Sequence, residues 1–151
     1  MTLILTSPAF DGAIPLRHAR AGLDLSPPLS WSGAPEGTHG FALSVEDPDA
    51  PGGAFVHWLL WDLSARARSL REGMAKARHL DDGAKQGING YGTIGWGGPE
   101  PPVGETHRYV FTLAALSAPL GLAAGADAES YFAELRRKAL TTASMIATFG
   151  R

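Results

Sequence analysis

The sequence of 151 residues contains no cysteine, and this absence excludes several kinds of chemistry at once. The chain can form no disulfide framework, supply no thiol nucleophile and build no zinc site from thiolates. A protein without cysteine is compatible with a reducing compartment, although such proteins also occur outside cells. A chain of this length can bury a sizeable core without cross-links, and we expect a single domain over residues 1–151.

The sequence also lacks a basic excess and a long apolar run. Lysine and arginine total 13, aspartate and glutamate total 15, and the net charge is −2. A surface with this balance is poorly suited to a phosphate backbone, so no nucleic-acid partner is expected. No apolar stretch has the length needed to span a bilayer, and residues 1–10 lack the pattern of a signal peptide. We therefore expect a cytoplasmic protein that does not insert into a membrane.

Glycine and proline, in contrast, are abundant, with 19 and 11 residues. They separate short apolar segments, a pattern typical of strands joined by many turns. Alternating or continuous apolar residues predict strands at 2–5, 41–46, 55–63, 108–116 and 145–149. Asp127 can cap a helix that runs to about Lys138. Together these segments predict a mainly β protein, an antiparallel β-sandwich with one or two short helices.

Residues 66–98 are the least regular part of the sequence. They are polar and rich in glycine, and their hydrophobic periodicity is weak. Long loops of this kind in compact domains are usually functional or mobile, so no regular structure is predicted for this segment.

Polar side chains gather around the three strongest predicted strands. Asp47 and Asp49 follow the strand at 41–46, in a turn stiffened by prolines. His57 lies inside the next strand, where period-two alternation predicts a face shared with Phe55, Leu59 and Trp61. A half-buried imidazole needs a hydrogen-bond partner, and Asp47 or Asp49 is the expected one.

His107 and Tyr109 are two residues apart at the start of the third strand, so they should point to the same side. A loop rich in glycine and proline precedes them and contains Gly98, Pro101 and Pro102. Glycine allows a ligand to approach backbone N–H groups, which can then form an anion-binding nest. Two imidazoles, a phenol and such N–H groups would together donate hydrogen bonds to a phosphate or carboxylate.

Each of these features has an ordinary structural explanation when taken singly. A histidine in a strand is more often a satisfied structural residue than a ligand-binding one. The Asp-Pro-Asp sequence is an ordinary turn, and the aromatic residues are ordinary core residues. Only their combination indicates a binding site.

In that combination the sequence resembles the phosphatidylethanolamine-binding protein family, with closest similarity to its bacterial Raf-kinase-inhibitor-like branch. The matching motifs are Asp47-Pro48-Asp49-Ala50-Pro51, His57-Trp58, Gly98-Pro99-Glu100-Pro101-Pro102 and His107-Arg108-Tyr109-Val110-Phe111. The resemblance implies a β-sandwich with one anion pocket at the surface. By position it assigns the ligand-binding role to Asp47, Asp49, Phe55, His57, Gly98, Pro101, Pro102, His107 and Tyr109.

The sequence departs from the family pattern at two positions. Trp96 replaces a tyrosine that is common in relatives, which removes a hydroxyl. Glu100 stands where a small residue is frequent, and we expect its carboxylate to face solvent because it would repel an anion. The long C-terminal helix of animal relatives is not evident, so a more open pocket is expected. Relatives of the bacterial branch can form homodimers, which makes a homodimer the expected assembly.

The resulting hypothesis is a binding or regulatory protein for a small anionic ligand, with no cofactor, no metal and no catalytic residue. The alternative is an enzyme of isomerase, cyclase or hydrolase type in which His57 and His107 act as general acid and base. No activated serine or lysine nucleophile stands out to support it. A third alternative is a divalent metal held by the two histidines and two aspartates. A kinase-inhibitor role rests on the family name alone.

Overall fold

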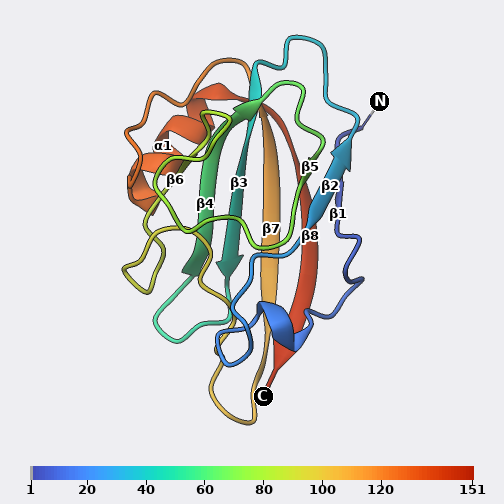
Figure 1. Cartoon of the computed structure of the whole chain (residues 1–151), viewed down its shortest axis with the longest axis vertical. Helices are drawn as coiled ribbons and strands as arrows, with labels where there is room; N and C mark the ends of the chain where they lie inside the picture. Colours follow the sequence, from blue (N-terminus) through green and yellow to red (C-terminus); the bar gives the residue numbers. More distant parts are fainter. Residues whose placement is uncertain (1) are drawn as a thin grey trace.

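The computed structural model describes residues 2–151 and arranges the strands in two antiparallel sheets (Figure 1). The smaller sheet has the order β1-β2-β5, with β1 at Ile4–Thr6, β2 at Leu29–Ser32 and β5 at Ser69–Leu70. The larger has the order β6-β4-β3-β7-β8, formed by Lys85–Gln86, Phe55–Ser64, Gly40–Asp47, Thr106–Leu116 and Ala139–Gly150. The predicted mainly β sandwich is confirmed.

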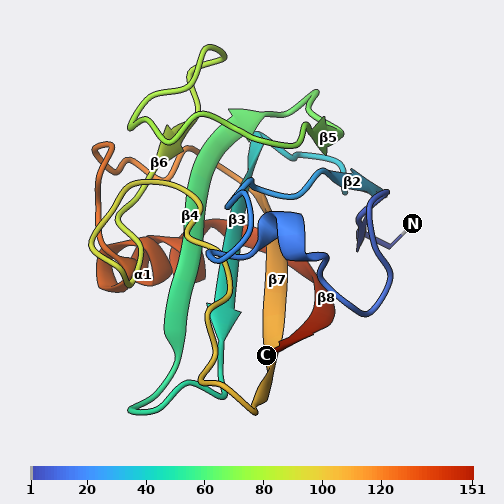
Figure 2. The ribbon, with the colours of Figure 1, turned by 60° about the horizontal axis from the view of Figure 1, so that its bottom comes forward.

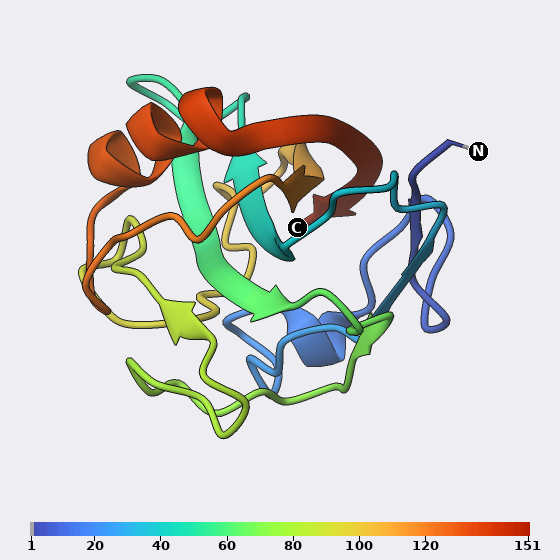
Figure 3. The ribbon, with the colours of Figure 1, turned by 90° about the horizontal axis from the view of Figure 1, so that it is seen from above.

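The larger sheet is covered on both faces. One face packs on the smaller sheet through a core that includes Trp31, Phe41, Trp58 and Phe111, none of them more than 5% exposed. The opposite face packs on helix α1, Ala128–Lys138 (Figure 3). This burial on both sides explains why the strand at 55–63 reads as an almost continuous apolar run.

Helix α1 begins and ends close to where the sequence predicts. The Asp127 side chain accepts a hydrogen bond of 2.9 Å from the Ser130 N–H, which satisfies one of the free donors of the first turn. The helix passes into β8 at Ala139 without a connecting loop, as Figure 3 shows. The prediction of a last strand at 145–149 was therefore too short, because residues 139–144 are small or polar and carry little apolar pattern although they pair with β7.

The irregular segment 66–98 holds only the two-residue strands β5 and β6, and much of it lies along the β4 side of the larger sheet (Figure 2). Gln86 organises much of it from a buried position. Its amide donates hydrogen bonds of 2.7 and 2.8 Å to the carbonyls of Ala75 and Ala77 and accepts one of 2.7 Å from Trp58 Nε1. The hydrogen bonds of this one buried side chain thus hold together a segment that has few backbone hydrogen bonds between strands.

A β-bulge in β4 decides where His57 points. Val45 pairs with Trp58 and Glu46 pairs with Val56, so His57 is the extra residue without a partner in β3. A bulge of this kind turns a side chain relative to simple alternation. Leu59 and Trp61 pack on the α1 face, whereas the His57 ring contacts Tyr109 on the opposite face. The predicted shared face of His57 with Leu59 and Trp61 is therefore wrong.

Among residues 2–151, no helix combines the length and apolar character required to cross a membrane.

Candidate functional site

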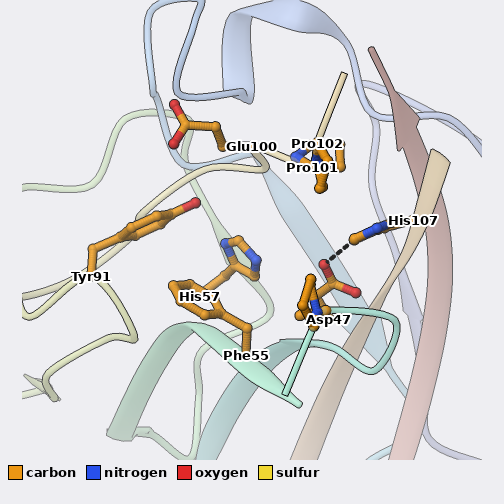
Figure 4. Close-up of a pocket in the computed structure, with 10 residues that line it drawn as sticks. Asp47, Phe55, His57, Tyr91, Glu100, Pro101, Pro102 and His107 are labelled. Atoms are coloured by element: carbon orange, nitrogen blue, oxygen red, sulfur yellow. Dashed lines mark hydrogen bonds and ion pairs between the residues drawn. The ribbon is translucent and has the colours of Figure 1, made fainter. Parts of the chain in front are cut away.

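A cavity of about 260 Å³ opens at the end of the larger sheet where β3 ends and where β4 and β7 begin. Antiparallel order brings these three strand ends together although they are far apart in sequence. Figure 4 shows side chains from all three strands and from two loops around one space. The lining residues are Asp47, Ala50, Pro51, Phe55, His57, Tyr91, Glu100, Pro101, Pro102 and His107.

Asp47 holds the imidazole of His107. The distance from Asp47 Oδ2 to His107 Nδ1 is 2.6 Å, and the two side chains are 5% and 4% exposed. The other carboxylate oxygen of Asp47 accepts a hydrogen bond of 2.8 Å from the Asp49 N–H. The expectation that an aspartate would pair with His57 is wrong, because Asp47 is committed to the histidine of the other neighbouring strand.

His107 has a second carboxylate partner that the sequence did not indicate. Glu105 Oε1 lies 2.8 Å from His107 Nε2, and the Glu105 side chain is 54% exposed. The hydrogen bonds from Glu105 and from Asp47 raise the pKa of His107 above its usual value, because both carboxylates favour the imidazolium. In the charged form of this ring, both N–H groups therefore donate hydrogen bonds to carboxylates of the protein, Asp47 and Glu105.

His57 is bound in a different way. Its Nδ1–H donates a hydrogen bond of 2.6 Å to the Gly97 carbonyl, and since a carbonyl can only accept, this fixes the tautomer. Burial lowers the pKa of His57 below its usual value, although the Gly97 carbonyl opposes this shift. Nε2 has no hydrogen-bond partner among residues 2–151, and the ring borders the cavity (Figure 4). At neutral pH this nitrogen presents a lone pair.

Aromatic rings hold His57 in place from three sides. The ring centroid of Phe55 lies 4.9 Å away, that of Tyr109 5.2 Å and that of Tyr91 5.8 Å. Phe55 and Tyr91 also contact each other edge to face at 4.7 Å. Such packing keeps the imidazole in one orientation and makes one side of the cavity apolar.

Asp49 lies outside the cavity and makes an exposed pair with Arg108. Its carboxylate accepts hydrogen bonds of 2.8 Å from the Arg108 backbone N–H, 3.0 Å from Nε and 2.7 Å from the second guanidinium nitrogen. The Arg108 side chain and backbone hold the pKa of Asp49 well below its usual range. This pair closes the turn after β3 and leaves Arg108 occupied.

Tyr109 and Gly98 also do not line the cavity. Tyr109 is buried beneath His57, its hydroxyl has no partner among the described residues, and burial raises its pKa. Gly98 donates its N–H to Asp24 Oδ1 at 2.7 Å, and a Cβ at this position would collide with the backbone of His18. Close packing against residues 18–24 therefore requires glycine here.

The N–H groups of Gly95, Gly97 and Gly98 are not available for the predicted anion-binding nest. Besides Gly98, the Gly97 N–H donates to the His57 carbonyl at 2.9 Å, and the Gly95 N–H donates to Gly87 at 3.3 Å. Each of these donors is used to hold the loop against β4 and its neighbours, so none is available to a ligand.

Several residues of the site were missed at the sequence level. Tyr91 comes from the irregular segment, where no periodicity marks it, and its hydroxyl donates a hydrogen bond of 2.8 Å to the Gly98 carbonyl. Glu100, by contrast, was expected at the site with its carboxylate facing solvent, and it is exposed at the rim of the cavity. The Asn89-Gly90 dipeptide indicates a turn next to Tyr91, and it is the local sequence signal that could have pointed to this residue. In the structure Gly90 lies directly against the Phe55 ring of the cavity.

Among residues 2–151, no group of three or more histidine, aspartate or glutamate side chains has an arrangement that could hold a metal ion. Asp47 and His107 face each other instead of a common centre.

Comparison with known proteins gives consistent matches over almost the whole chain. Residues 6–150 match the family model described as phosphatidylethanolamine-binding protein. A protein of Aquifex aeolicus named UPF0098 protein is 41% identical over 140 residues, which cover 91% of this chain and 81% of that protein. The crystal structure of Escherichia coli YbcL, titled a new member of the mammalian PEBP family, aligns with a TM-score of 0.91 at 30% identity and covers 99% of this chain and 98% of that one.

A third relative bears on location. A Mycobacterium tuberculosis protein named as a lipoprotein, LppC, is 37% identical over 150 residues, which cover 97% of this chain and 72% of that protein. Since one relative is named as a lipoprotein, the cytoplasmic location of the present chain stays a prediction.

Proposed function

Since this chain belongs to the phosphatidylethanolamine-binding protein family, we propose that its cavity binds the phosphate group, or a comparable anionic group, of a small molecule. The observation that carries the proposal is the Nε2 of His57, which borders the cavity and has no hydrogen-bond partner among residues 2–151. No described residue hydrogen-bonds to this nitrogen, although the rest of the ring is fixed by Gly97 and by aromatic contacts.

The size and polarity of the cavity suit a headgroup. A volume of about 260 Å³ lies below the roughly 300–1,000 Å³ of sites for drug-sized ligands. Phe55, Pro101 and Tyr91 supply apolar wall, and His57 Nε2 supplies a polar contact. A small polar group therefore enters, and any larger part of the molecule stays at the mouth.

The protonation states specify how the group is bound. Neutral His57 accepts a hydrogen bond at Nε2, so it pairs with an oxygen that carries a proton, such as the hydroxyl of monohydrogen phosphate. When His57 itself is protonated, the same nitrogen donates to a fully deprotonated oxygen. His107 adds no net positive charge, because its two ring nitrogens are paired with the Asp47 and Glu105 carboxylates. Binding should therefore strengthen as the pH falls below neutrality.

The test is a titration with inorganic phosphate and with phosphoethanolamine, followed through the imidazole signals of uniformly ¹⁵N-labelled protein by NMR. We expect shifts at His57 and His107 with millimolar ligand, and His57→Ala should remove the response. His39→Ala serves as the matched control, because His39 is exposed and lies outside the cavity. Unchanged ring signals at millimolar concentrations of both ligands would overturn the proposal.

A further inference from the structure

A second cavity lies on the other side of Tyr91 from the first. Its volume is about 420 Å³, and its wall includes Arg20, Asp24, Lys76, Tyr91, Trp96 and Gly97. Tyr91 is the one residue that lines both cavities. Phe55 and His57 pack on it from the first cavity, whereas Arg20 covers its ring from the second.

The dividing wall is thin and fixed. The Tyr91 hydroxyl is bound to the Gly98 carbonyl at 2.8 Å. Gly97 presents its carbonyl to His57 in the first cavity while the residue itself borders the second. A Cβ on Gly97 would lie 2.5 Å from the Tyr91 ring, so glycine allows the ring to lie flat against the loop. The same short loop therefore shapes both spaces.

Arg20 is a cation without a carboxylate partner among residues 2–151. Its guanidinium carbon lies 3.9 Å from the Tyr91 ring centroid, in the geometry of a cation–π contact. Arg108 is committed to Asp49, and the guanidinium of Arg151 donates to the Pro101 carbonyl at the rim of the first cavity. Lys76 in the second cavity pairs with Asp24 at 3.0 Å, so its charge is also balanced. Only Arg20 has positive charge to offer to a ligand at this wall.

Acidic groups surround the first cavity, and their negative charge limits the affinity with which a single anionic group can bind there. Asp47 and Glu105 both contact His107, and Glu100 stands at the rim. A second anionic group of the same molecule would escape these carboxylates by reaching past Tyr91 to Arg20. The His57 ring centroid is 5.8 Å from that of Tyr91, and the Arg20 guanidinium carbon is 3.9 Å from it. Because the Tyr91 ring is fixed between the two positions, a chain of a few carbon atoms that joins the two anionic groups would pass around the edge of this ring.

From this geometry we propose that the second cavity is a subsite for a second anionic group, with Arg20 as its binding residue. The ligand class is a small molecule with two anionic groups, of which one enters the first cavity. This inference rests on the proposed function of the first cavity. Arg20 is kept in position by its backbone N–H, which donates to the Pro99 carbonyl at 3.2 Å, next to the loop that borders the first cavity.

The test compares two probes that differ only in the second charge, monobutyl phosphate and 1,4-butanediol bisphosphate, by isothermal titration calorimetry. Wild-type protein should bind the bisphosphate about fivefold more tightly, the gain expected of one partly exposed ion pair. In Arg20→Gln the two probes should bind with equal affinity. Arg17→Gln is the control, because Arg17 is nearby and exposed but pairs with Glu72 and should keep the wild-type ratio.

The outcomes separate the two proposals. Equal binding of the two probes by wild-type protein overturns the second subsite and leaves the first cavity as a phosphate site. A bisphosphate advantage that survives in Arg20→Gln also overturns it, because the second charge then binds elsewhere. Failure of both probes to bind overturns the proposed function together with this inference.

Discussion

His107 Nδ1 lies 2.6 Å from Asp47 Oδ2, and both side chains are almost completely buried. The two residues are 60 positions apart in the sequence, at the end of β3 and the start of β7. The contact orients the imidazole and favours its charged form, because a buried carboxylate next to an imidazole stabilises the imidazolium. The polar side of the first cavity is built on this pair.

Asp47→Asn should destabilise the protein by about 2 kcal/mol, the usual value of a hydrogen bond to a charged group. The amide cannot match the carboxylate as partner for imidazolium, and a buried donor loses its best acceptor. Denaturant unfolding at pH 6 measures the change. Asp49→Asn is the matched control, since this carboxylate pairs with Arg108 at the surface and its loss should have a small effect. Similar losses in the two variants would contradict the buried pair.

The contributions of His107 and His57 to the free energy of unfolding should depend on pH in opposite directions. The pKa of His107 is raised in the folded state by Glu105 and Asp47, so its contribution is complete below about pH 6.5 and is lost as the pH rises through its folded pKa. The pKa of His57 is lowered by burial, so its contribution is present above about pH 6.5 and is lost as the pH falls through its folded pKa.

Unfolding free energies of wild type, His107→Gln and His57→Gln between pH 5 and 9 test this. The difference between wild type and His107→Gln should shrink as the pH rises. The difference between wild type and His57→Gln should shrink as the pH falls. Parallel profiles for all three proteins would show that neither histidine titrates differently in the folded state.

Glu105→Gln should lower the pKa of His107, because the hydrogen bond from Glu105 is the largest cause of its raised value. The change also removes a negative charge that competes with an incoming anion for the same ring. At pH 5.5, where the ring stays charged, phosphate should therefore bind the variant more tightly. NMR titration of the imidazole gives the pKa and the affinity together. Glu100→Gln, at the rim of the cavity, should leave the pKa of His107 in place.

Gly98→Ala should destabilise the protein by about 3 kcal/mol, at the upper end of the usual overpacking penalty. The added Cβ meets the rigid backbone of His18 rather than a flexible side chain. Gly53→Ala is the control, because that position is open and only its φ of +115° opposes a side chain, which costs about 1 kcal/mol. If Gly98 instead served a ligand, its variant would fold normally and bind phosphate less well.

Local patterns were sufficient to predict most of the fold. Apolar alternation located β3, β4 and β7, and a capping aspartate located α1. These patterns predict strands and helices correctly because each one depends only on residues that are a few positions apart in the sequence. The beginning of β8 carries no such pattern, since its small and polar residues are held by pairing with β7 rather than by burial.

The site was predicted less completely because its contacts cross strands. Asp47 or Asp49 was expected to bind His57, which is about ten positions away along the chain. Since β3 lies between β4 and β7, the carboxylate at its end can reach either neighbour, and it binds His107. The bulge that turns His57 towards the cavity leaves no mark in the sequence. Tyr91 depends on a loop organised by Gln86, a contact that no periodicity reveals.

Arg151 is tied to the rim of the first cavity. Its backbone N–H donates to the Glu105 carbonyl at 3.1 Å, its own carbonyl accepts from the Gly104 N–H at 2.9 Å, and its guanidinium donates to the Pro101 carbonyl at 3.2 Å. The N-terminal end of the described chain lies at the opposite end of the molecule (Figure 1). A polyhistidine purification tag fused after Arg151 would place additional imidazoles near His57 and His107, whose NMR signals the binding assays follow. Protein for those assays should carry its tag before residue 1 or carry none.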